Sequence, residues 1–320
     1  MALLEVQNLR TYFYTRRGVV KAVDGVSFTV NRGECVGILG ESGCGKSVTL
    51  YSILRLVARP AGQIVGGEVL LNGQDLLKLS EEDMRGIRGR QISLILQDPN
   101  TSLNPVFTCG FQIEEPLRIH QGLRPPRLQE QAEERLKLVK ISDPHQRMAN
   151  YPHQISGGMR QRVMGAIAMS CEPELLLADE PTTSLDTTVQ EQYLSLLKSI
   201  QEEKGLALIY VTHSIPVLSR ICDRVVVMYA GKAVEKAPLQ ELLEKPCHPY
   251  TQGLIACIPW PDKDVERLVS IPGQPPEPIS LPPGCSFAPR CDYVMDRCRI
   301  EYPPEVEIGE DHTCSCWKVA

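Results

Sequence analysis

A glycine-rich segment with a lysine and a serine carries the first chemical signal. Residues 40–47 read GESGCGKS, which follows the pattern G-x-x-x-x-G-K-S between an apolar stretch and a helical pattern. Glycines let consecutive backbone N–H groups point at one anion, and the helix N-terminus adds its positive dipole end. Lys46 would then contact the β- and γ-phosphates of a nucleotide, and the Ser47 hydroxyl would ligate Mg²⁺. The residues predicted to hold the nucleotide here are Gly40, Ser42, Gly43, Cys44, Gly45, Lys46, Ser47 and Val48.

Two carboxylates form the second signal. Asp179 and Glu180 come directly after the apolar run Leu175–Ala178. A carboxylate suits Mg²⁺, and a carboxylate beside a phosphate group can accept a proton from an attacking water. We predict that Asp179 holds Mg²⁺, directly or through water, and that Glu180 polarises the water. Two acids at the end of a strand can also be merely solvated, but the phosphate loop upstream favours the catalytic interpretation.

The apolar patterns around these residues predict an α/β fold. Leu175–Ala178 and Leu206–Val211 are continuous apolar runs, which are typical of strands buried on both faces of a parallel sheet. Residues 1–95 have the alternation and turn residues of strands joined by hairpins. Residues 98–165 combine several prolines with apolar side chains at helical spacing. These patterns indicate an α/β core with an N-terminal antiparallel β subdomain and a helical insertion.

The composition changes near the end of the chain. Residues 272–289 contain seven prolines, which predicts an extended connector, and a cysteine-rich segment follows. We therefore predict a nucleotide-binding domain over residues 1–245, with its helical subdomain at about 98–165. The remaining residues, 246–320, are predicted to form a small C-terminal extension.

The overall composition excludes several classes of protein. The chain has 320 residues, 42% of them hydrophobic, and a formal net charge of −5. The acidic balance argues against bulk nucleic-acid binding. No apolar run reaches the roughly 18 residues of a membrane span, and the N-terminus lacks the basic segment of a secretory signal. We expect a protein on the cytosolic side that can still dock on a membrane protein.

A third motif makes the resemblance to a family specific. Residues 155–162 read ISGGMRQR, which closely resembles the L-S-G-G-Q signature of ATP-binding-cassette (ABC) ATPases. Isoleucine and methionine replace the first and last signature residues, while Ser156, Gly157 and Gly158 are kept. The resemblance implies that this hydroxyl and the following backbone N–H groups approach a γ-phosphate across a dimer of cassettes. The motif stands 23 residues before Asp179, in the order that the family shows.

Further family elements follow in order along the chain. Gln97 matches the Q-loop glutamine, which in the family bridges Mg²⁺ or water to the membrane partner. Ser184-Leu185-Asp186 matches the D-loop, so Asp186 is expected near the nucleotide. His213 matches the H-loop histidine, which contacts the γ-phosphate. Ser214 departs from the aspartate that many relatives carry after this histidine, and we expect only a local change in hydrogen bonding.

An aromatic residue near the N-terminus is expected to stack on the adenine ring. Phe13 lies where the family places this residue, and Tyr12 and Tyr14 are close rivals. An aromatic core residue of the first hairpin is the alternative interpretation.

Three segments narrow the resemblance to one subfamily. Residues 97–105 (QDPNTSLNP), 248–251 (HPYT) and 284–291 (GCSFAPRC) are similar to those of the D-type ATP-binding subunits of dipeptide and oligopeptide ABC importers. The resemblance implies two membrane permease subunits, a solute-binding protein and a second, distinct F-type cassette, with the chain peripheral on the cytoplasmic face of the inner membrane. A homodimer of cassettes stays open, and no nucleic acid is expected.

The terminal cysteines predict a metal site. Cys285, Cys291, Cys298 and Cys314 lie on short loops, and Cys316 follows two residues later. Four thiolates suit zinc or an iron–sulfur cluster, but C-x-x-C pairs of common zinc sites are lacking. Related importer subunits are associated with a four-iron, four-sulfur cluster at this pattern. Zinc, or free or disulfide-bonded cysteines, remain open. We expect Cys316 to be a bystander, although it could substitute for Cys314.

Two other functions fit parts of the sequence. Nickel and other small-solute importers share much of the pattern, so the cargo is not fixed. A soluble, non-transport ABC ATPase with a metal-sensing tail is an alternative of a different class, although such proteins usually carry two cassettes or a long coiled-coil insertion. The sequence shows one cassette and no sustained heptad run.

Overall fold

The structure is a computed structural model, and it describes residues 2–183, 185–258 and 270–320. The chain forms two compact units, each built from separate stretches of sequence. The first, which we call the helical unit, comprises Met1–Leu3, Val30–Cys35 and Lys78–Val211. The second, which we call the phosphate-loop unit, comprises Leu4–Thr29, Val36–Leu77 and Thr212–Ala320.

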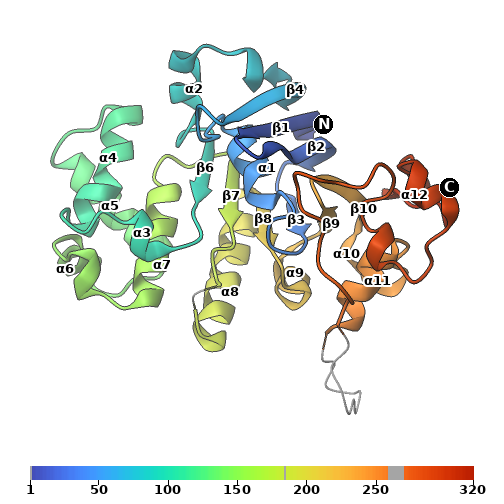
Figure 1. Cartoon of the computed structure of the whole chain (residues 1–320). Helices are drawn as coiled ribbons and strands as arrows, with labels where there is room; N and C mark the ends of the chain where they lie inside the picture. Colours follow the sequence, from blue (N-terminus) through green and yellow to red (C-terminus); the bar gives the residue numbers. More distant parts are fainter. Residues whose placement is uncertain (1, 184, 259–269) are drawn as a thin grey trace. The chain divides into compact units, whose positions relative to one another are not determined.

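The helical unit alternates strands with helices along the chain. Its elements are α2 (Glu81–Ile87), β6 (Ile92–Ile95), α3 (Pro99–Ser102), α4 (Cys109–Gln121), α5 (Arg127–Leu138), α6 (Pro144–Met148), the 3₁₀ turn Pro152–Gln154, α7 (Gly157–Ala168), β7 (Leu175–Asp179), α8 (Thr187–Lys204) and β8 (Ala207–Thr212, whose last residue belongs to the other unit). The group α3 to α7 corresponds to the helical insertion expected from the proline and apolar pattern (Figure 1).

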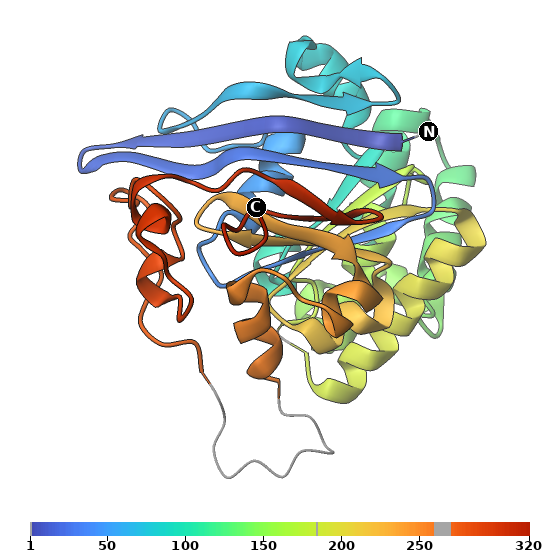
Figure 2. The same cartoon turned by 90° about the vertical axis from the view of Figure 1, so that its right-hand side faces the viewer.

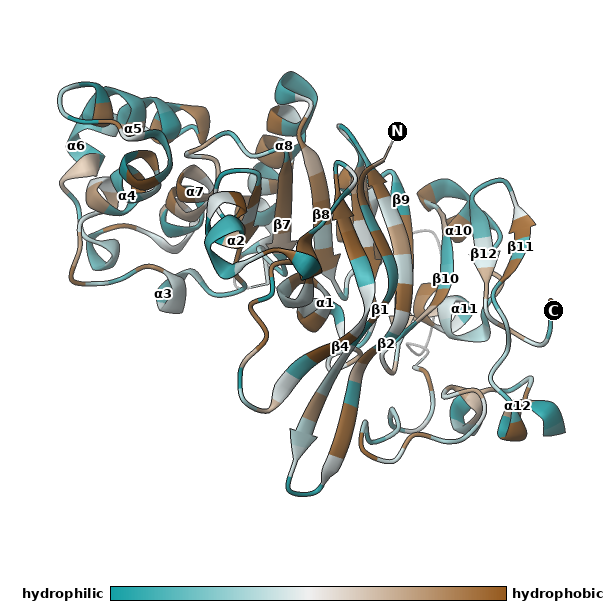
Figure 3. Ribbon diagram, turned by 90° about the horizontal axis from the view of Figure 1, so that it is seen from above, coloured by the Kyte–Doolittle hydropathy of each residue, from teal (hydrophilic) through white to brown (hydrophobic). Residues whose placement is uncertain are grey.

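Three strands of this unit are parallel and fully buried in their centre. β6 pairs with β7, and β7 pairs with β8, with Leu175 opposite both Ile92 and Ala207. Every residue of β7 and of β8 is buried, which explains their continuous apolar sequences. Both strands are among the hydrophobic ribbons of Figure 3. Because parallel strands end at the same edge, the residues after β6 and β7 are brought together there.

A buried arginine links the helices around α5. The Arg135 guanidinium donates to the Ser170 carbonyl oxygen at 3.1 Å and pairs with Glu172 at 3.0 Å. α4 packs against α5 and α7, and its buried positions include Ile113 and Leu117. The signature helix α7 is therefore packed within its own group of helices.

The phosphate-loop unit contains the N-terminal strands and the C-terminal extension. Its elements are β1 (Ala2–Thr15), β2 (Gly18–Asn31), β3 (Cys35–Leu39), α1 (Lys46–Ile53), β4 (Gly62–Leu71), β5 (Gln74–Asp75), the 3₁₀ turn Leu76–Lys78, α9 (Ile215–Ile221), β9 (Arg224–Tyr229), β10 (Lys232–Pro238), α10 (Leu239–Glu244), α11 (Pro249–Ala256), the 3₁₀ turn Ala288–Arg290, α12 (Asp296–Ile300), β11 (Val306–Gly309) and β12 (His312–Cys314). Some terminal residues of these elements belong to the helical unit, namely Ala2, Leu3, Val30, Asn31, Cys35 and Lys78.

An antiparallel sheet in the order β2-β1-β4-β5 opens this unit. The two 14-residue strands β1 and β2 form the long hairpin of Figure 2. β1 pairs with β4 from Leu4 opposite Leu71 to Phe13 opposite Gly62. The expected antiparallel β subdomain is therefore present.

The C-terminal extension adds strands to the β-structure of the same unit. β3 pairs in parallel with β9, and β9 continues into the antiparallel strand β10. β12 pairs with β10, so that Cys314 lies opposite Glu235, and β11 pairs with β12. No helix among the described residues is long and apolar enough to cross a membrane.

Candidate functional site

The phosphate loop connects the buried strand β3 to α1, and two of its glycines are sterically required. A Cβ atom on Gly40 would lie 2.3 Å from the Met228 carbonyl oxygen. Gly45 has φ +108°, and a Cβ there would lie 2.1 Å from the Ala22 carbonyl oxygen. No side chain fits at either position, so the backbone itself forms the loop wall. The loop ends where α1 begins at Lys46, with Gly45 as the N-cap residue.

Lys46 lies against the backbone of this loop. Its ammonium group donates to the Gly40 carbonyl oxygen at 2.8 Å and to the Glu41 carbonyl oxygen at 3.0 Å. Ser47 and Val48 occupy the next positions of the first helical turn. The predicted residues of the loop are thus gathered around one turn and one helix N-terminus, an arrangement that can bind an anion.

The three candidate aromatic residues lie in different surroundings on β1. Phe13 is half-buried, and a Cβ on Gly62 would lie 2.8 Å from its ring. Tyr12 donates to Asp24 at 2.7 Å, and burial together with this hydrogen bond raises the pKa of Tyr12 to about 12. Tyr14 is 46% exposed. Since the Tyr12 hydroxyl is hydrogen-bonded to Asp24, Phe13 and Tyr14 are the better candidates for stacking on the adenine ring.

His213 and Ser214 follow β8 at its carboxyl end. His213 is exposed, as a residue that contacts a bound phosphate would be. The Ser214 side chain makes no capping bond to α9, while its backbone N–H donates to the Thr212 hydroxyl at 3.1 Å. The serine therefore provides no side-chain cap to the following helix.

Glu180 is held at the end of β7 in a strained conformation. Its φ of 44° lies in the left-handed region, which non-glycine residues rarely adopt. Its backbone N–H donates to the Val211 carbonyl oxygen at 3.0 Å. One carboxylate oxygen accepts from Gln97 Nε2 at 3.3 Å and from the Thr183 hydroxyl at 3.1 Å. The structure thus brings together Gln97 and Glu180, which are 83 residues apart in the sequence. The neighbouring Asp179 is the last residue of β7 and is only 2% exposed.

The signature motif forms the start of α7. Ser156 is the N-cap residue, and its hydroxyl accepts from the Met159 N–H at 3.4 Å. Ser156 and Gly157 are exposed, whereas a Cβ on Gly158 would lie 2.8 Å from a methyl group of Val189. Bare backbone N–H groups at an exposed helix N-terminus are suited to phosphate.

The D-loop leads into α8. Asp186 is the N-cap residue of α8, and its side chain accepts from the Val189 N–H at 3.0 Å. The expected Ser184 lies outside the described residues. Asp186 therefore has a clear structural role, and a nucleotide contact for it stays a prediction.

Four cysteines of the C-terminal extension line one small cavity of about 20 Å³. They are Cys285, Cys291, Cys298 and Cys316. Cys314 is instead fully buried in β12 and is not among the residues that line this cavity. The structure therefore places Cys316, which the sequence offered only as a substitute, beside the other three thiols.

Sequence reasoning missed a contact between the extension and the phosphate loop. Arg290 pairs with Glu41 of the loop at 2.7 Å, and the Tyr250 hydroxyl accepts from the Glu41 N–H at 2.9 Å. Both residues stand in segments that carried the subfamily resemblance, without a role being assigned to them. An arginine between Pro289 and Cys291 gave no signal of its own, because its partner is 249 residues away.

Fold and site together define a P-loop ATPase of the cassette type. The sequence profile of the ABC transporter family matches residues 23–183. The chain also superposes on the bacterial ABC transporter cassette MJ0796 with a TM-score of 0.66 and 29% identity, over 74% of this chain and 98% of that one. The predicted ABC-type fold is confirmed.

The C-terminal region narrows this class further. Residues 234–298 match the C-terminal region of oligopeptide/dipeptide transporters. The oligopeptide transport ATP-binding protein AppD of Bacillus subtilis is 46% identical over 98% of this chain and 96% of its own length. The dipeptide transport ATP-binding protein DppD of the same organism is 46% identical over 98% of this chain and 94% of its own. The chain belongs to the ABC transporter family, in its oligopeptide and dipeptide branch.

Proposed function

We propose that this chain is the ATP-hydrolysing subunit of an ABC importer that takes up dipeptides or oligopeptides through membrane permease subunits. The observation that carries the ATP-hydrolysing role is the contact of Gln97 with Glu180 at the end of β7. In a chain of this family, Gln97 is the residue expected to sense the membrane partner and Glu180 is the expected general base. The hydrogen bond between them therefore links these two roles. The names of AppD and DppD support the same class of cargo.

Glu180 would act as the base for the attacking water. The Glu180 carboxylate accepts hydrogen bonds from Gln97 and Thr183, and the Glu180 backbone N–H donates to Val211. These contacts fix the orientation of the carboxylate. Fixed orientation matters because proton transfer requires hydrogen-bond distance to the water that attacks the γ-phosphate.

The other groups would stabilise phosphate charge. Lys46 supplies a cation beside the loop, and His213 contacts the γ-phosphate. Mg²⁺, when bound, neutralises the charge of the phosphates. Ser47, Gln97 and Asp179 would hold it, because their oxygen atoms are the ligands that Mg²⁺ prefers.

A second cassette would complete the site. In the proposed cycle, Ser156 and the N–H groups of Gly157 and Gly158 contact the nucleotide that the partner cassette holds on its own phosphate loop. Since neither cassette completes a site alone, ATP binding favours the closed dimer and hydrolysis reopens it. We propose that the partner is a distinct F-type paralogue, as the two-cassette importers of this branch suggest.

Replacing Glu180 by glutamine tests the catalytic assignment. In the transporter assembled with its permease subunits, steady-state ATP turnover should fall roughly 100-fold or more, while ATP stays bound. Glu203→Gln, an exposed change on α8, is the control and should leave turnover unchanged. Unchanged turnover in Glu180→Gln would contradict the assignment.

The exposed segment after Gln97 is our candidate for the permease contact. Val106 and Phe107 are 70% and 42% exposed. The Gln112 amide donates to the carbonyl oxygens of Asn104 and Phe107, at 3.1 Å each, so this apolar tip is presented on an ordered turn. An exposed apolar pair on a fixed turn suits a helix of a membrane subunit.

For the cysteine cavity we propose a four-iron, four-sulfur cluster with Cys285, Cys291, Cys298 and Cys316 as ligands. Four thiols around one cavity are the donor set that such clusters use. Zinc–sulfur bonds of about 2.3 Å would bring four sulfurs within about 4 Å of one another. Among the described residues, the group of three or more His, Cys, Asp or Glu residues whose ligand atoms all lie within 4.8 Å of one another is Glu235, Cys247 and His312. The four cavity cysteines do not form such a close group among the described residues, and the cluster is proposed on their donor set.

Metal analysis tests this part of the proposal. The chain, purified without oxygen, should contain about four iron and four sulfide per protein. About one zinc would replace the cluster by a structural zinc site. A folded chain without metal would refute both sites and leave the ATPase assignment in place.

A further inference from the structure

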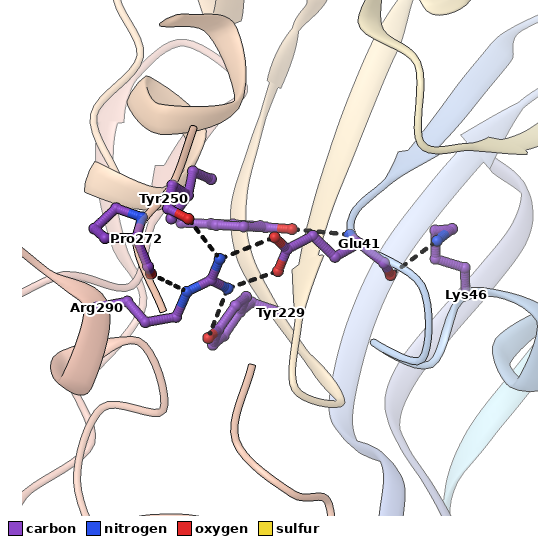
Figure 4. A network of polar contacts seen from close by, with 7 residues as sticks. Glu41, Lys46, Tyr229, Tyr250, Pro272 and Arg290 are labelled. Atoms are coloured by element: carbon purple, nitrogen blue, oxygen red, sulfur yellow. Dashed lines mark hydrogen bonds and ion pairs between the residues drawn. The ribbon is translucent and has the colours of Figure 1, made fainter. Parts of the chain in front are cut away.

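The guanidinium group of Arg290 joins the C-terminal extension to the phosphate loop (Figure 4). Its two terminal nitrogens pair with the two carboxylate oxygens of Glu41, at 2.7 and 3.0 Å. One of these nitrogens also donates to the Tyr229 hydroxyl at 3.3 Å, and the other to the Ile271 carbonyl oxygen at 3.5 Å. Nε donates to the Pro272 carbonyl oxygen at 2.9 Å. Each of the five N–H donors of the guanidinium thus has an acceptor.

This ion pair is shielded from water on the arginine side. The Arg290 side chain is 4% exposed and that of Glu41 is 28% exposed. Arg290 lies 5.9 Å from the ring centroids of both Tyr229 and Phe287. A bidentate pair in such surroundings is stronger and more directional than a surface salt bridge. Its geometry fixes the Glu41 side chain in one place.

A second contact fixes the backbone of the same residue. The Tyr250 hydroxyl accepts from the Glu41 N–H at 2.9 Å, and Tyr250 is fully buried. Its ring packs against Tyr229 and Phe287, with centroids 4.6 and 5.4 Å away. Residues of the C-terminal extension therefore fix both the backbone and the side chain of Glu41.

Glu41 is the first variable residue of the phosphate loop, and the loop depends on its position. The Glu41 carbonyl oxygen accepts from Lys46 at 3.0 Å and from the Cys44 N–H at 3.3 Å. The side chain of Glu41 meanwhile pairs with Arg290. One residue thus connects the extension to the lysine and to the turn that form the phosphate site.

We propose that Arg290 and Tyr250 are positioning residues for the phosphate loop, which hold Glu41 so that the loop keeps its nucleotide-binding shape. The proposal rests on the nucleotide-binding role proposed above. It gives the C-terminal extension a direct part in nucleotide affinity, in addition to any metal that it carries. The contact acts through Glu41 and does not require either residue to touch the nucleotide.

The test measures the dissociation constant of a fluorescent ATP analogue with Mg²⁺ on the full-length chain, well below its melting temperature. Arg290→Lys keeps the positive charge but loses the bidentate geometry, so the dissociation constant should rise roughly ten-fold. Tyr250→Phe keeps the packed ring and removes only the acceptor, and the constant should rise about three-fold. Arg299→Lys, an exposed change in the same extension, is the control and should have no effect.

Glu41→Gln separates positioning from simple electrostatics. Removing a negative charge beside a phosphate site would by itself strengthen ATP binding. The positioning role predicts weaker binding, again roughly ten-fold, with no further loss when Arg290→Lys is added, because both changes break one contact.

The outcomes distinguish the two proposals. If the wild-type chain does not bind the analogue, the proposed function itself fails. If it binds and the Arg290 and Tyr250 variants bind equally well, even with lowered melting temperatures, the contact is only structural and the positioning role is refuted. If Arg290→Lys does not fold, Tyr250→Phe decides the matter, since its ring packing is unchanged.

Discussion

At the scale of single residues, Cys44 shows how the phosphate loop shields its own thiol. Cys44 is 5% exposed, and burial raises the pKa of its thiol above the ordinary value. Its N–H closes the turn on the Glu41 carbonyl oxygen at 3.3 Å. A thiolate is the reactive form, so a buried thiol with a raised pKa reacts slowly at neutral pH. Cys44 therefore serves the loop as a small apolar residue.

Alkylation with iodoacetamide should reveal this difference. At pH 8, Cys44 should react at least about ten-fold more slowly than the half-exposed Cys257. Because the raised pKa shifts thiolate formation to higher pH, labelling of Cys44 should increase only at pH values above the range in which ordinary thiols ionise. Peptide mass spectrometry over a pH series measures both rates. Equal labelling of the two cysteines at pH 8 would contradict the buried geometry.

The choice between Cys314 and Cys316 as the fourth metal ligand also depends on single residues. Cys316 lines the cavity with three other thiols, whereas Cys314 is fully buried in β12. Cys316→Ala should therefore lose most of the bound metal, and Cys314→Ala should keep it. Iron and sulfide per chain, measured on protein purified without oxygen, compare the two variants. Metal loss in Cys314→Ala alone would restore the ligand set expected from the spacing.

At the scale of elements, α7 combines a structural cap with a proposed catalytic contact. Ser156 caps α7 through the Met159 N–H at 3.4 Å, and Ser80 caps α2 in the same way through the Asp83 N–H at 3.1 Å. Both serines are exposed. The two helices thus offer a matched pair in which only one cap belongs to the signature motif.

Alanine at each cap should separate the two roles. Ser156→Ala and Ser80→Ala should each lower the free energy of unfolding by about 1 kcal/mol. Only Ser156→Ala should also lower ATP turnover in the assembled transporter, roughly 100-fold, because the hydroxyl would contact the partner's γ-phosphate. Chemical denaturation and an ATPase assay give the two readouts. Equal turnover in both variants would reduce Ser156 to a helix cap.

The sequence predicted those elements whose signals are local. The continuous apolar runs of β7 and β8 follow from burial on both faces, and the loop glycines follow from the close approach of backbone atoms. Contacts that join distant segments were not accessible in this way. Nothing in the sequence around Cys314 indicates that β12 pairs with β10 and buries it, so the spacing does not reveal that Cys316 lines the cavity and Cys314 does not. The pairing of Arg290 with Glu41 spans 249 residues and leaves no periodic pattern.

At the scale of the whole molecule, the predicted site residues are divided between the two units. The phosphate loop, Arg290 and His213 belong to the phosphate-loop unit, and Gln97 and Glu180 belong to the helical unit. Transport further requires that a membrane partner senses the nucleotide. The natural place for that contact in the helical unit is the ordered turn that carries Val106, because Val106 lies nine residues after Gln97 and exposes apolar surface.

A charge at Val106 should uncouple the chain from its permease. Val106 is 70% exposed and Ile300 in α12 is 75% exposed, so aspartate at either position should leave folding and ATP affinity of the isolated chain unchanged. An unpaired charge is unfavourable at an apolar position that a protein interface buries. Val106→Asp should therefore lower both co-purification with the permease subunits and coupled ATP turnover roughly ten-fold or more. Ile300→Asp, the matched control, should lower neither. If both variants co-purify like the wild type, the permease must dock elsewhere, and the apolar tip between Asn104 and Phe107 would need another partner.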